Sequence, residues 1–193
     1  MIEHFKYHNT NCFFMKSGTN GKLLAIDAGW PCTLYEYYRE LKTIGYSHDR
    51  IAWAVVTHFH MDHAGLVSAF IDEGITCYVF EHQQESIDAM EKIILKNHKE
   101  YRTIDKRRLV SVNAEDSKEL FASLGIHGTV IATPGHSPDS ISFISDEHEV
   151  IIGDLAPVNV ILPDDVNNLA CWELIRSTGG KQIYPSHAEP FVL

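Results

Sequence analysis

The chain has 193 residues, of which 45% are hydrophobic and 22% charged, and this balance is typical of a folded globular protein. The formal charge of −10, from 16 basic and 26 acidic side chains, argues against a nucleic-acid partner, because phosphate contacts require a cationic surface. No apolar run approaches the roughly 20 residues that cross a bilayer, and the first residues lack the pattern of a signal peptide. We therefore expect a cytoplasmic protein with no membrane partner.

The first elements predicted along the chain are two strands and a helix. Residues 11–15 and 22–26 flank a turn containing Asn20-Gly21, which is typical of a β-hairpin. Apolar and tyrosine side chains then recur at helical spacing from Leu34 to Leu41. Pro31 is expected in the first turn of this helix, and its end is expected near Gly45.

The middle of the chain predicts a βαβ unit. Residues 51–57 form a continuous apolar run, as expected of a central strand covered on both faces. A helix over 64–73 returns the chain to a strand at 76–80. Residues 83–124 predict a charged helical insertion. The remaining expected elements are strands at 128–132, 141–144, 149–152 and 182–184, and a helix over 166–176. Residues 1–193 are expected to form one α/β domain.

The most informative segment follows the predicted central strand and contains three imidazoles and one carboxylate: His58, His60, Asp62 and His63. Such donors suit zinc, iron or manganese, and without a metal they have no reason to crowd together. Three more candidate donors follow strands in the same way: His136, Asp154 and His187. Because strand ends at one edge of a sheet converge on one crevice, we expect a single site.

The number of donors favours two metals. One tetrahedral zinc with an open position needs only three protein ligands, whereas seven donors are available here. They suit two ions, provided that one carboxylate bridges them, and this geometry holds a water or hydroxide between the ions.

Five motifs of this chain resemble, in the same order, those of the metallo-β-lactamase-fold hydrolase superfamily, specifically its glyoxalase II-like dinuclear branch. They are Asp27 at a strand end, the His-x-His-x-Asp-His segment, His136, Gly153-Asp154 and His187. The resemblance spans nearly the whole chain. It implies a four-layer αββα sandwich with metals at one edge of its two sheets. It also implies which side chains hold each metal: His58, His60 and His136 the first, Asp62, His63 and His187 the second, with Asp154 as the bridge.

Two departures narrow the function that the resemblance implies. The commonest branch of true β-lactamases carries Cys where Asp154 stands, which argues against antibiotic hydrolysis. The sequence ends shortly after His187, without the C-terminal helical domain with which glyoxalase II binds glutathione thioesters. This difference argues against glyoxalase II activity in the strict sense.

We therefore expect a dinuclear metal-dependent hydrolase that attacks an ester, thioester or lactone carbonyl of a small-molecule substrate through a metal-bridging hydroxide. Asp62 is expected to be catalytic, orienting the nucleophile and moving a proton while remaining a ligand. Two divalent ions are implied, in the first place Zn²⁺, with Fe or Mn as alternatives. Two other functions stay open: a phosphodiesterase or nuclease at the same site, and iron-dependent oxygen or redox chemistry. The sequence does not indicate the oligomeric state.

Several other residues allow plainer interpretations. The basic side chains between Lys92 and Arg108 either form a solvated helix face or overhang the metals and attract an anionic substrate. Trp30, Phe59, Met61 and Tyr184 either line an apolar pocket or pack in the core. Asp27 is expected to hold a metal ligand by a hydrogen bond. Asp139 and Asp165 are either turn residues or part of the rim of the site.

The remaining cysteines and histidines are not expected to be functional. No Cys-x-x-Cys pair is present, and reduced, mostly buried side chains are expected at Cys12, Cys32, Cys77 and Cys171. Solvent-exposed imidazoles that bind no metal are expected at His4, His8, His48, His82, His98, His127 and His148.

Overall fold

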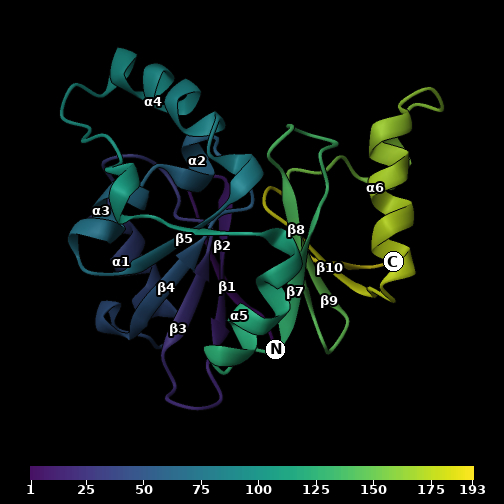
Figure 1. Cartoon of the computed structure of the whole chain (residues 1–193), viewed down its shortest axis with the longest axis horizontal. Coiled ribbons are helices and arrows are strands. Elements are labelled where there is room, and N and C mark those ends of the chain that lie inside the picture. Colours follow the sequence, from purple (N-terminus) through teal and green to yellow (C-terminus); the bar gives the residue numbers. More distant parts are fainter.

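The computed structural model describes residues 1–193 and shows two β-sheets packed face to face between outer helices (Figure 1). The first sheet has the strand order β1-β2-β3-β4-β5-β6: β1 (Glu3–Tyr7), β2 (Thr10–Lys16), β3 (Leu23–Ile26), β4 (Ile51–Val55), β5 (Thr76–Phe80) and β6 (Val110–Val112). The second has the order β11-β10-β9-β8-β7: β11 (Phe191–Val192), β10 (Gln182–Pro185), β9 (Glu149–Gly153), β8 (Ile141–Ser145) and β7 (Gly128–Ala132).

Helices cover the outer face of each sheet. On the first sheet lie α1 (Leu34–Thr43), α2 (Met61–Ala64), α3 (Val67–Asp72) and α4 (Ser86–Asn97), and on the second lies α6 (Val166–Ser177) (Figure 1). The short helix α5 (Ser117–Ser123) packs on β7. The longest helices, α4 and α6, have 12 residues, and none of the helices combines the length and apolar composition needed to span a bilayer.

The alternation of side chains along β2 shows why four layers form. Successive side chains of a strand point to opposite faces, so a strand that is apolar at every position must be covered twice. Cys12 and Phe14 pack with the helices outside the first sheet, whereas Phe13 and Met15 pack between the two sheets. The expected αββα sandwich is confirmed.

Most of the predicted elements are present. β2 and β3 form the predicted antiparallel hairpin, and β4 and β5 pair in parallel around α3 as the βαβ unit requires. Strands β7, β8, β9 and β10 and helix α6 lie within one or two residues of the predicted ranges.

Three predicted helices differ from the structure. The first helix begins at Leu34 and not at Pro31, because Cys32 has a left-handed backbone with φ +64° that no helix accommodates. The helix expected over 64–73 is divided into α2 and α3, since Gly65 packs directly on Pro31. The segment 83–124 is not helical throughout, because β6 extends the first sheet by pairing with β5. The structure also contains β1 and β11, which were not predicted from the sequence.

Candidate metal centre

All seven predicted donors lie together where strands of both sheets end. His58 and His60 follow β4, Asp62 and His63 lie in α2, and the other three follow β7, β9 and β10. Their ligand atoms form two groups, each within 4.8 Å: His58, His60, His136 and Asp154 in one, and Asp62, His63 and His187 in the other. The two groups are those that the family resemblance implies.

Asp154 lies between the two groups. Its Oδ2 faces the first group, 3.5 Å from His136 Nε2 and 3.8 Å from His58 Nε2. Its Oδ1 faces the second group, 3.2 Å from both His63 Nε2 and His187 Nε2. One carboxylate therefore presents one oxygen to each group, as a bridge between two ions requires.

A glycine allows this position. Gly153 has φ +57°, and a Cβ there would lie 2.9 Å from Thr57 Oγ1, the residue just before His58. Only glycine therefore lets the end of β9 approach the end of β4 this closely. Because the two strands belong to different sheets, this contact brings Asp154 to the cluster of histidines.

Hydrogen bonds fix which ring nitrogen faces the centre in three of the five imidazoles. His187 Nδ1 lies 2.7 Å from Asn9 O and His63 Nδ1 lies 2.9 Å from Asp27 Oδ2, so both Nδ1 atoms donate to an oxygen. Thr57 Oγ1 donates to Asp27 and therefore accepts from His58 Nδ1, 3.1 Å away. In all three rings Nε2 is left to face the centre, as in histidine metal ligands held by outer partners.

Orphaned polar atoms indicate that a metal fits. His58 Nε2, His63 Nε2 and Asp154 Oδ1 are buried without a hydrogen-bond partner, although they lie close to one another. Buried polar atoms nearly always have a partner, so three such atoms converging on one point are costly in the protein alone. Imidazole nitrogen and carboxylate oxygen are donors for zinc, iron and manganese, so this donor set suits such ions.

The charges of these groups also suit a cation. Burial, reinforced by His63, lowers the pKa of His58 to about 2, so its ring is neutral and its lone pair is available. Burial opposes ionisation of Asp62 and Asp154, but the imidazoles around them, foremost His63, hold both carboxyl pKa values well below their usual range. Burial alone would lower the pKa of His63, yet the carboxylates of Asp27, Asp154 and Asp62 raise it well above its ordinary value.

The aspartates outside the ligand set have structural contacts. Asp27 is buried and has a left-handed backbone with φ +71°. Its carboxylate accepts hydrogen bonds from the backbone N–H of Thr57 at 2.7 Å and from His63 Nδ1, so it holds a candidate metal ligand as expected. Asp139 is buried and accepts from the backbone N–H of Phe59 at 2.7 Å, which fixes the loop between His58 and His60. Asp165 caps the start of α6. The sequence did not predict the hydrogen bond between Asp139 and Phe59, because the two residues are 80 positions apart in the chain.

A cavity of about 460 Å³ lies beside His60 and Asp62. Three of the four aromatic or apolar residues considered for a pocket line it, namely Trp30, Phe59 and Met61, together with α4 residues such as Ile93. Tyr184 does not line it; its ring packs near Phe13 and its hydroxyl donates to Glu149 at 3.0 Å. No Lys or Arg is among the lining residues.

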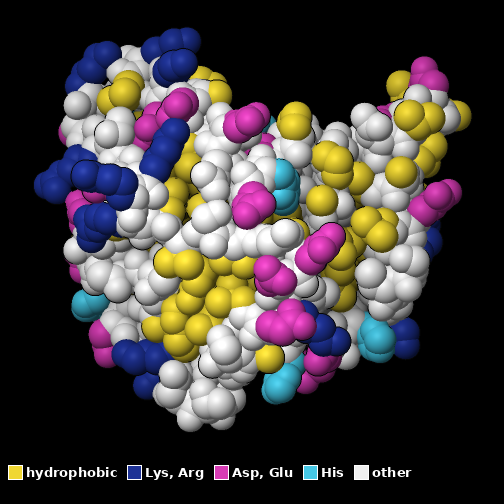
Figure 2. Space-filling model, in the orientation of Figure 1, with side chains coloured by type: hydrophobic (Ala, Val, Ile, Leu, Met, Phe, Trp, Pro, Cys, Tyr) yellow, Lys and Arg dark blue, Asp and Glu magenta, His cyan; other side chains and the backbone are white.

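The basic side chains of residues 92–108 lie elsewhere. Arg102 and Arg108 pair with Asp72, at 3.2 and 2.8 Å, and Arg107 pairs with Asp105 at 2.9 Å. Figure 2 shows the Lys and Arg side chains of this face gathered mainly over α3, α4 and the loop after α4. This position favours a solvated, ion-paired surface over an overhang above the metal centre.

One cysteine differs from expectation. All four cysteines are free, and Cys12, Cys77 and Cys171 are buried as predicted, whereas Cys32 is exposed. The left-handed backbone at Cys32 turns the side chain away from the core, which the sequence could not indicate. None of the seven histidines outside the centre is buried.

Comparisons with known proteins agree with this arrangement. The model of the Metallo-beta-lactamase superfamily matches residues 6–190 of the chain. The Beta-lactamase-like protein 2 homolog of Caenorhabditis elegans is 25% identical over 187 residues, which cover 95% of this chain and 57% of that protein. The chain thus spans little more than half the length of this curated relative.

Two solved structures show the same fold at low sequence identity. TTHA1623 in a di-iron-bound form is 20% identical with a TM-score of 0.71, and the match covers 100% of this chain and 94% of that one. The metallo-beta-lactamase FIM-1 from Pseudomonas aeruginosa in a mono-zinc form is 18% identical with a TM-score of 0.67, covering 99% and 84%. Both iron and zinc therefore occur in structures of this fold.

Proposed function

The chain belongs to the metallo-beta-lactamase superfamily, whose members are mostly metal-dependent hydrolases, and from this premise we propose that it is a dinuclear hydrolase of the glyoxalase II-like branch. The proposed substrate is an ester, a thioester or a lactone with an apolar, uncharged acyl group. The observation that carries the proposal is the position of Asp154, with one carboxylate oxygen toward each donor group.

The proposed ligands follow the two groups of donors. The first ion would be held by three imidazoles, those of His58, His60 and His136. The second would be held by Asp62 and His63 of α2 and by His187, which follows β10, and Asp154 would be shared. We propose Zn²⁺ in the first place, with iron or manganese as alternatives that the same donors accept. When bound, such ions polarise a carbonyl and lower the pKa of water from about 16 to about 7, so that a nucleophile is available at neutral pH.

Asp62 is the proposed catalytic residue. Its Oδ2 lies 3.2 Å from His187 Nε2 and accepts a hydrogen bond from Thr10 Oγ1 at 3.2 Å, which holds the carboxylate in one orientation. Trp30 Nε1 in turn donates to Thr10 Oγ1 at 3.2 Å. With a pKa near 2, Asp62 remains ionised and can accept a proton from the attacking water, then deliver it to the leaving oxygen or sulfur.

The surroundings of the centre support an apolar acyl group. The cavity of about 460 Å³ next to His60 and Asp62 is closed on one side by Met90 and Ile93 of α4. Beyond Asp154, the loop before α6 exposes Val160 and Leu162, at 62% and 66%. Figure 2 shows apolar side chains on this projecting part of the molecule. Apolar groups thus lie on both sides of the centre, and such surfaces mark ligand sites.

The test is a substrate screen on protein whose metal content has been measured. Esters, thioesters and lactones with acyl chains of increasing length are compared with a β-lactam and a phosphodiester. Carbonyl hydrolysis is expected in wild type with two ions bound and is lost in His58→Ala, whereas exposed His48→Ala serves as the matched control. Turnover of the phosphodiester alone would support the alternative function. Protein that holds two ions but cleaves no carbonyl substrate would overturn the proposal.

A further inference from the structure

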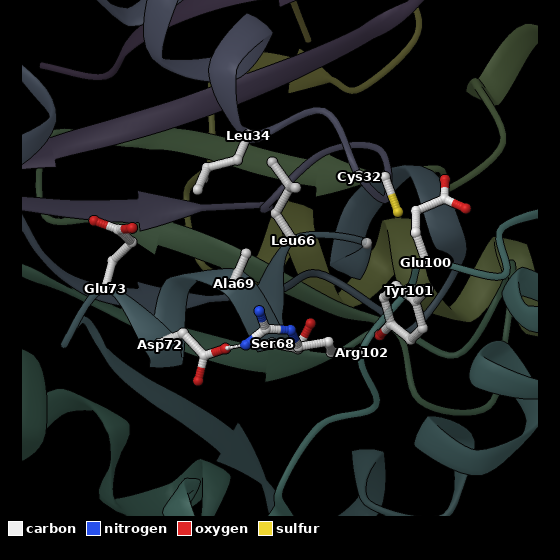
Figure 3. Close-up of a pocket in the computed structure, with 11 residues that line it drawn as sticks. Cys32, Leu34, Leu66, Ser68, Ala69, Asp72, Glu73, Glu100, Tyr101 and Arg102 are labelled. Atoms are coloured by element: carbon white, nitrogen blue, oxygen red, sulfur yellow. Dashed lines mark hydrogen bonds and ion pairs between the residues drawn. The ribbon is translucent and has the colours of Figure 1, made fainter.

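A second group of metal-type donors lies outside the centre described above. The Cys32 sulfur, a ring nitrogen of His98 and a carboxylate oxygen of Glu100 all lie within 4.8 Å of one another. His98 Nδ1 is 3.5 Å from Glu100 Oε1. Figure 3 shows the Cys32 sulfur and the Glu100 carboxylate side by side at one end of a cavity of about 470 Å³. The three donors come from two loops, one after β3 and one after α4.

The loop after β3 holds Cys32 in an uncommon conformation. Its φ of +64° is in the left-handed region, which residues other than glycine rarely adopt unless the surroundings impose it. Tyr7 OH accepts from Trp30 N at 2.7 Å, and Thr33 Oγ1 donates to Trp30 O at 2.7 Å. The loop is thus fixed on both sides of Cys32, with the sulfur directed outward.

The loop after α4 is ordered in a similar way. The backbone N–H of His98 donates to Ile94 O at 2.9 Å, and that of Tyr101 donates to His98 O at 3.2 Å, which forms a turn. Tyr101 is only 7% exposed and lines the cavity together with Cys32 and Glu100. Its ring belongs to the hydrophobic core outside the first sheet, which anchors this loop beside Cys32.

We propose that Cys32, His98 and Glu100 bind a divalent metal ion, Zn²⁺ by the chemistry of its donors, at a site separate from the dinuclear centre. Thiolate, imidazole and carboxylate are the three donor types that zinc combines in proteins. Three protein ligands leave a fourth position for water or a small ligand from the cavity. Softer sulfur also distinguishes this site from the main centre, which has only nitrogen and oxygen donors.

Such an ion would fix the loop after α4 to the loop after β3. The cavity beside the main centre is lined by Ile93 of α4, the helix that precedes the first of these loops, and by Trp30 of the loop after β3. The proposed ion would therefore connect the two segments that carry these lining residues. This inference needs only the ligand chemistry of three side chains and is independent of the proposed hydrolytic function.

The test uses Co²⁺ as a spectroscopic probe with metal-stripped protein. A thiolate bound to Co²⁺ gives intense charge-transfer absorption in the near ultraviolet, which nitrogen and oxygen ligands do not give. Because the main centre contains no sulfur donor and the other three cysteines are buried, this band reports on Cys32 alone. Wild-type protein is expected to show the band and to hold one more ion than Cys32→Ser, whatever the occupancy of the main centre.

Variants of the other two ligands complete the test. His98→Ala and Glu100→Gln are expected to weaken the binding of Co²⁺ by at least about tenfold. Loss of a residue that only orients a metal ligand already lowers affinity by about this factor, so loss of a ligand itself should cost at least as much. Glu73→Gln is the matched control, since Glu73 lies at the opposite end of the same cavity (Figure 3). No band in wild type, a band that survives in Cys32→Ser, or full affinity in His98→Ala and Glu100→Gln would each overturn the proposal.

Discussion

His63 Nδ1 and Asp27 Oδ2 lie 2.9 Å apart, and both side chains are completely buried. Asp27 also accepts from Thr57 N at 2.7 Å and from Thr57 Oγ1 at 3.1 Å, so one carboxylate orients His63 and, through Thr57, His58. A single residue outside the ligand set thereby holds one imidazole of each donor group. Such partners of metal ligands determine the orientation and basicity of the ring.

Asp27→Asn is expected to weaken metal binding without unfolding the protein. Asparagine tolerates the left-handed backbone at this position, where φ is +71°, but it removes the negative charge beside His63. Affinity for the second ion should fall by about 10- to 100-fold, the usual cost of losing an outer partner. A competitive chelator titration measures it, with exposed Asp146→Asn as the control. Unchanged affinity would contradict the role of Asp27.

Asp62→Ala should lower both metal content and turnover. Asp62 Oδ2 lies 3.4 Å from His63 Nε2 and 3.2 Å from His187 Nε2, so its removal leaves the second donor group with two imidazoles. The loss of a proton-transfer group reduces kcat by roughly 10²- to 10⁴-fold. Metal analysis and steady-state kinetics on the same preparation measure both effects. A normal rate at full metal content would show that Asp62 is not catalytic.

Removal of metal with a chelator should lower the thermal stability. The Nε2 atoms of His58 and His63 and the Oδ1 atom of Asp154, which have no hydrogen-bond partner, would be satisfied by a bound cation. An ion present at 100 times its Kd stabilises the folded state by about 2.7 kcal/mol, which corresponds to roughly 5–10 °C in Tm per ion for a chain of this size. Differential scanning calorimetry before and after dialysis against chelator tests this. A Tm that does not change would argue that no ion is bound in the isolated protein.

The seven donors could be predicted from their positions after apolar runs, whereas the four-layer fold and the division of the donors between two ions came from the family resemblance of the ordered motifs. His58, His136, Asp154 and His187 follow the carboxyl ends of strands, and such ends are where the ligand sites of α/β sheets lie. Other contacts depend on the folding of distant segments. The cluster of Cys32, His98 and Glu100 forms only because two loops pack together, and the left-handed φ of Cys32 leaves no signal in the residue type.

The same distinction explains the helices that were predicted incorrectly. Residues 64–73 carry a helical pattern, but the packing of Gly65 on the loop after β3 interrupts it. Val110 and Val112 lie in a strand because residues 110–112 pair in parallel with β5 at the edge of the first sheet. At Gly65 a tertiary contact outweighed local helical propensity, whereas at Val110 and Val112 the β-branched side chains themselves favour a strand.

Ile93→Asp should change the preference for acyl chains. Ile93 lines the cavity beside His60 and Asp62 and is 51% exposed, so a carboxylate there is tolerated by the fold but makes the wall polar. For wild type, each added methylene that enters the cavity should contribute about 0.8 kcal/mol, or about fourfold in kcat/KM. In Ile93→Asp this increase should disappear, while the shortest substrate is cleaved normally. Leu174→Asp on α6, where Leu174 is 43% exposed, is the control, and equal loss in both variants would exclude a role for the cavity.

Gly65→Ala should disturb both the stability and the second donor group. A Cβ at residue 65 would overlap the backbone nitrogen of Pro31 and the carbonyl oxygen of Met61, neither of which can move aside. Gly65 N also donates to Gly29 O at 2.8 Å, and this contact seats α2, with Asp62 and His63, on the loop after β3.

Overpacking of this kind costs about 1–3 kcal/mol, or roughly 2–12 °C in Tm for a chain of this length. Because α2 must shift to relieve the overlap, affinity for the second ion should fall more than affinity for the first. Gly18→Ala is the matched control, since its nearest neighbour would be 3.6 Å away, and it should change the free energy of unfolding by less than about 0.5 kcal/mol. If Gly65→Ala were as stable as Gly18→Ala and bound both ions normally, the packing of α2 on the loop after β3 could not be what positions Asp62 and His63.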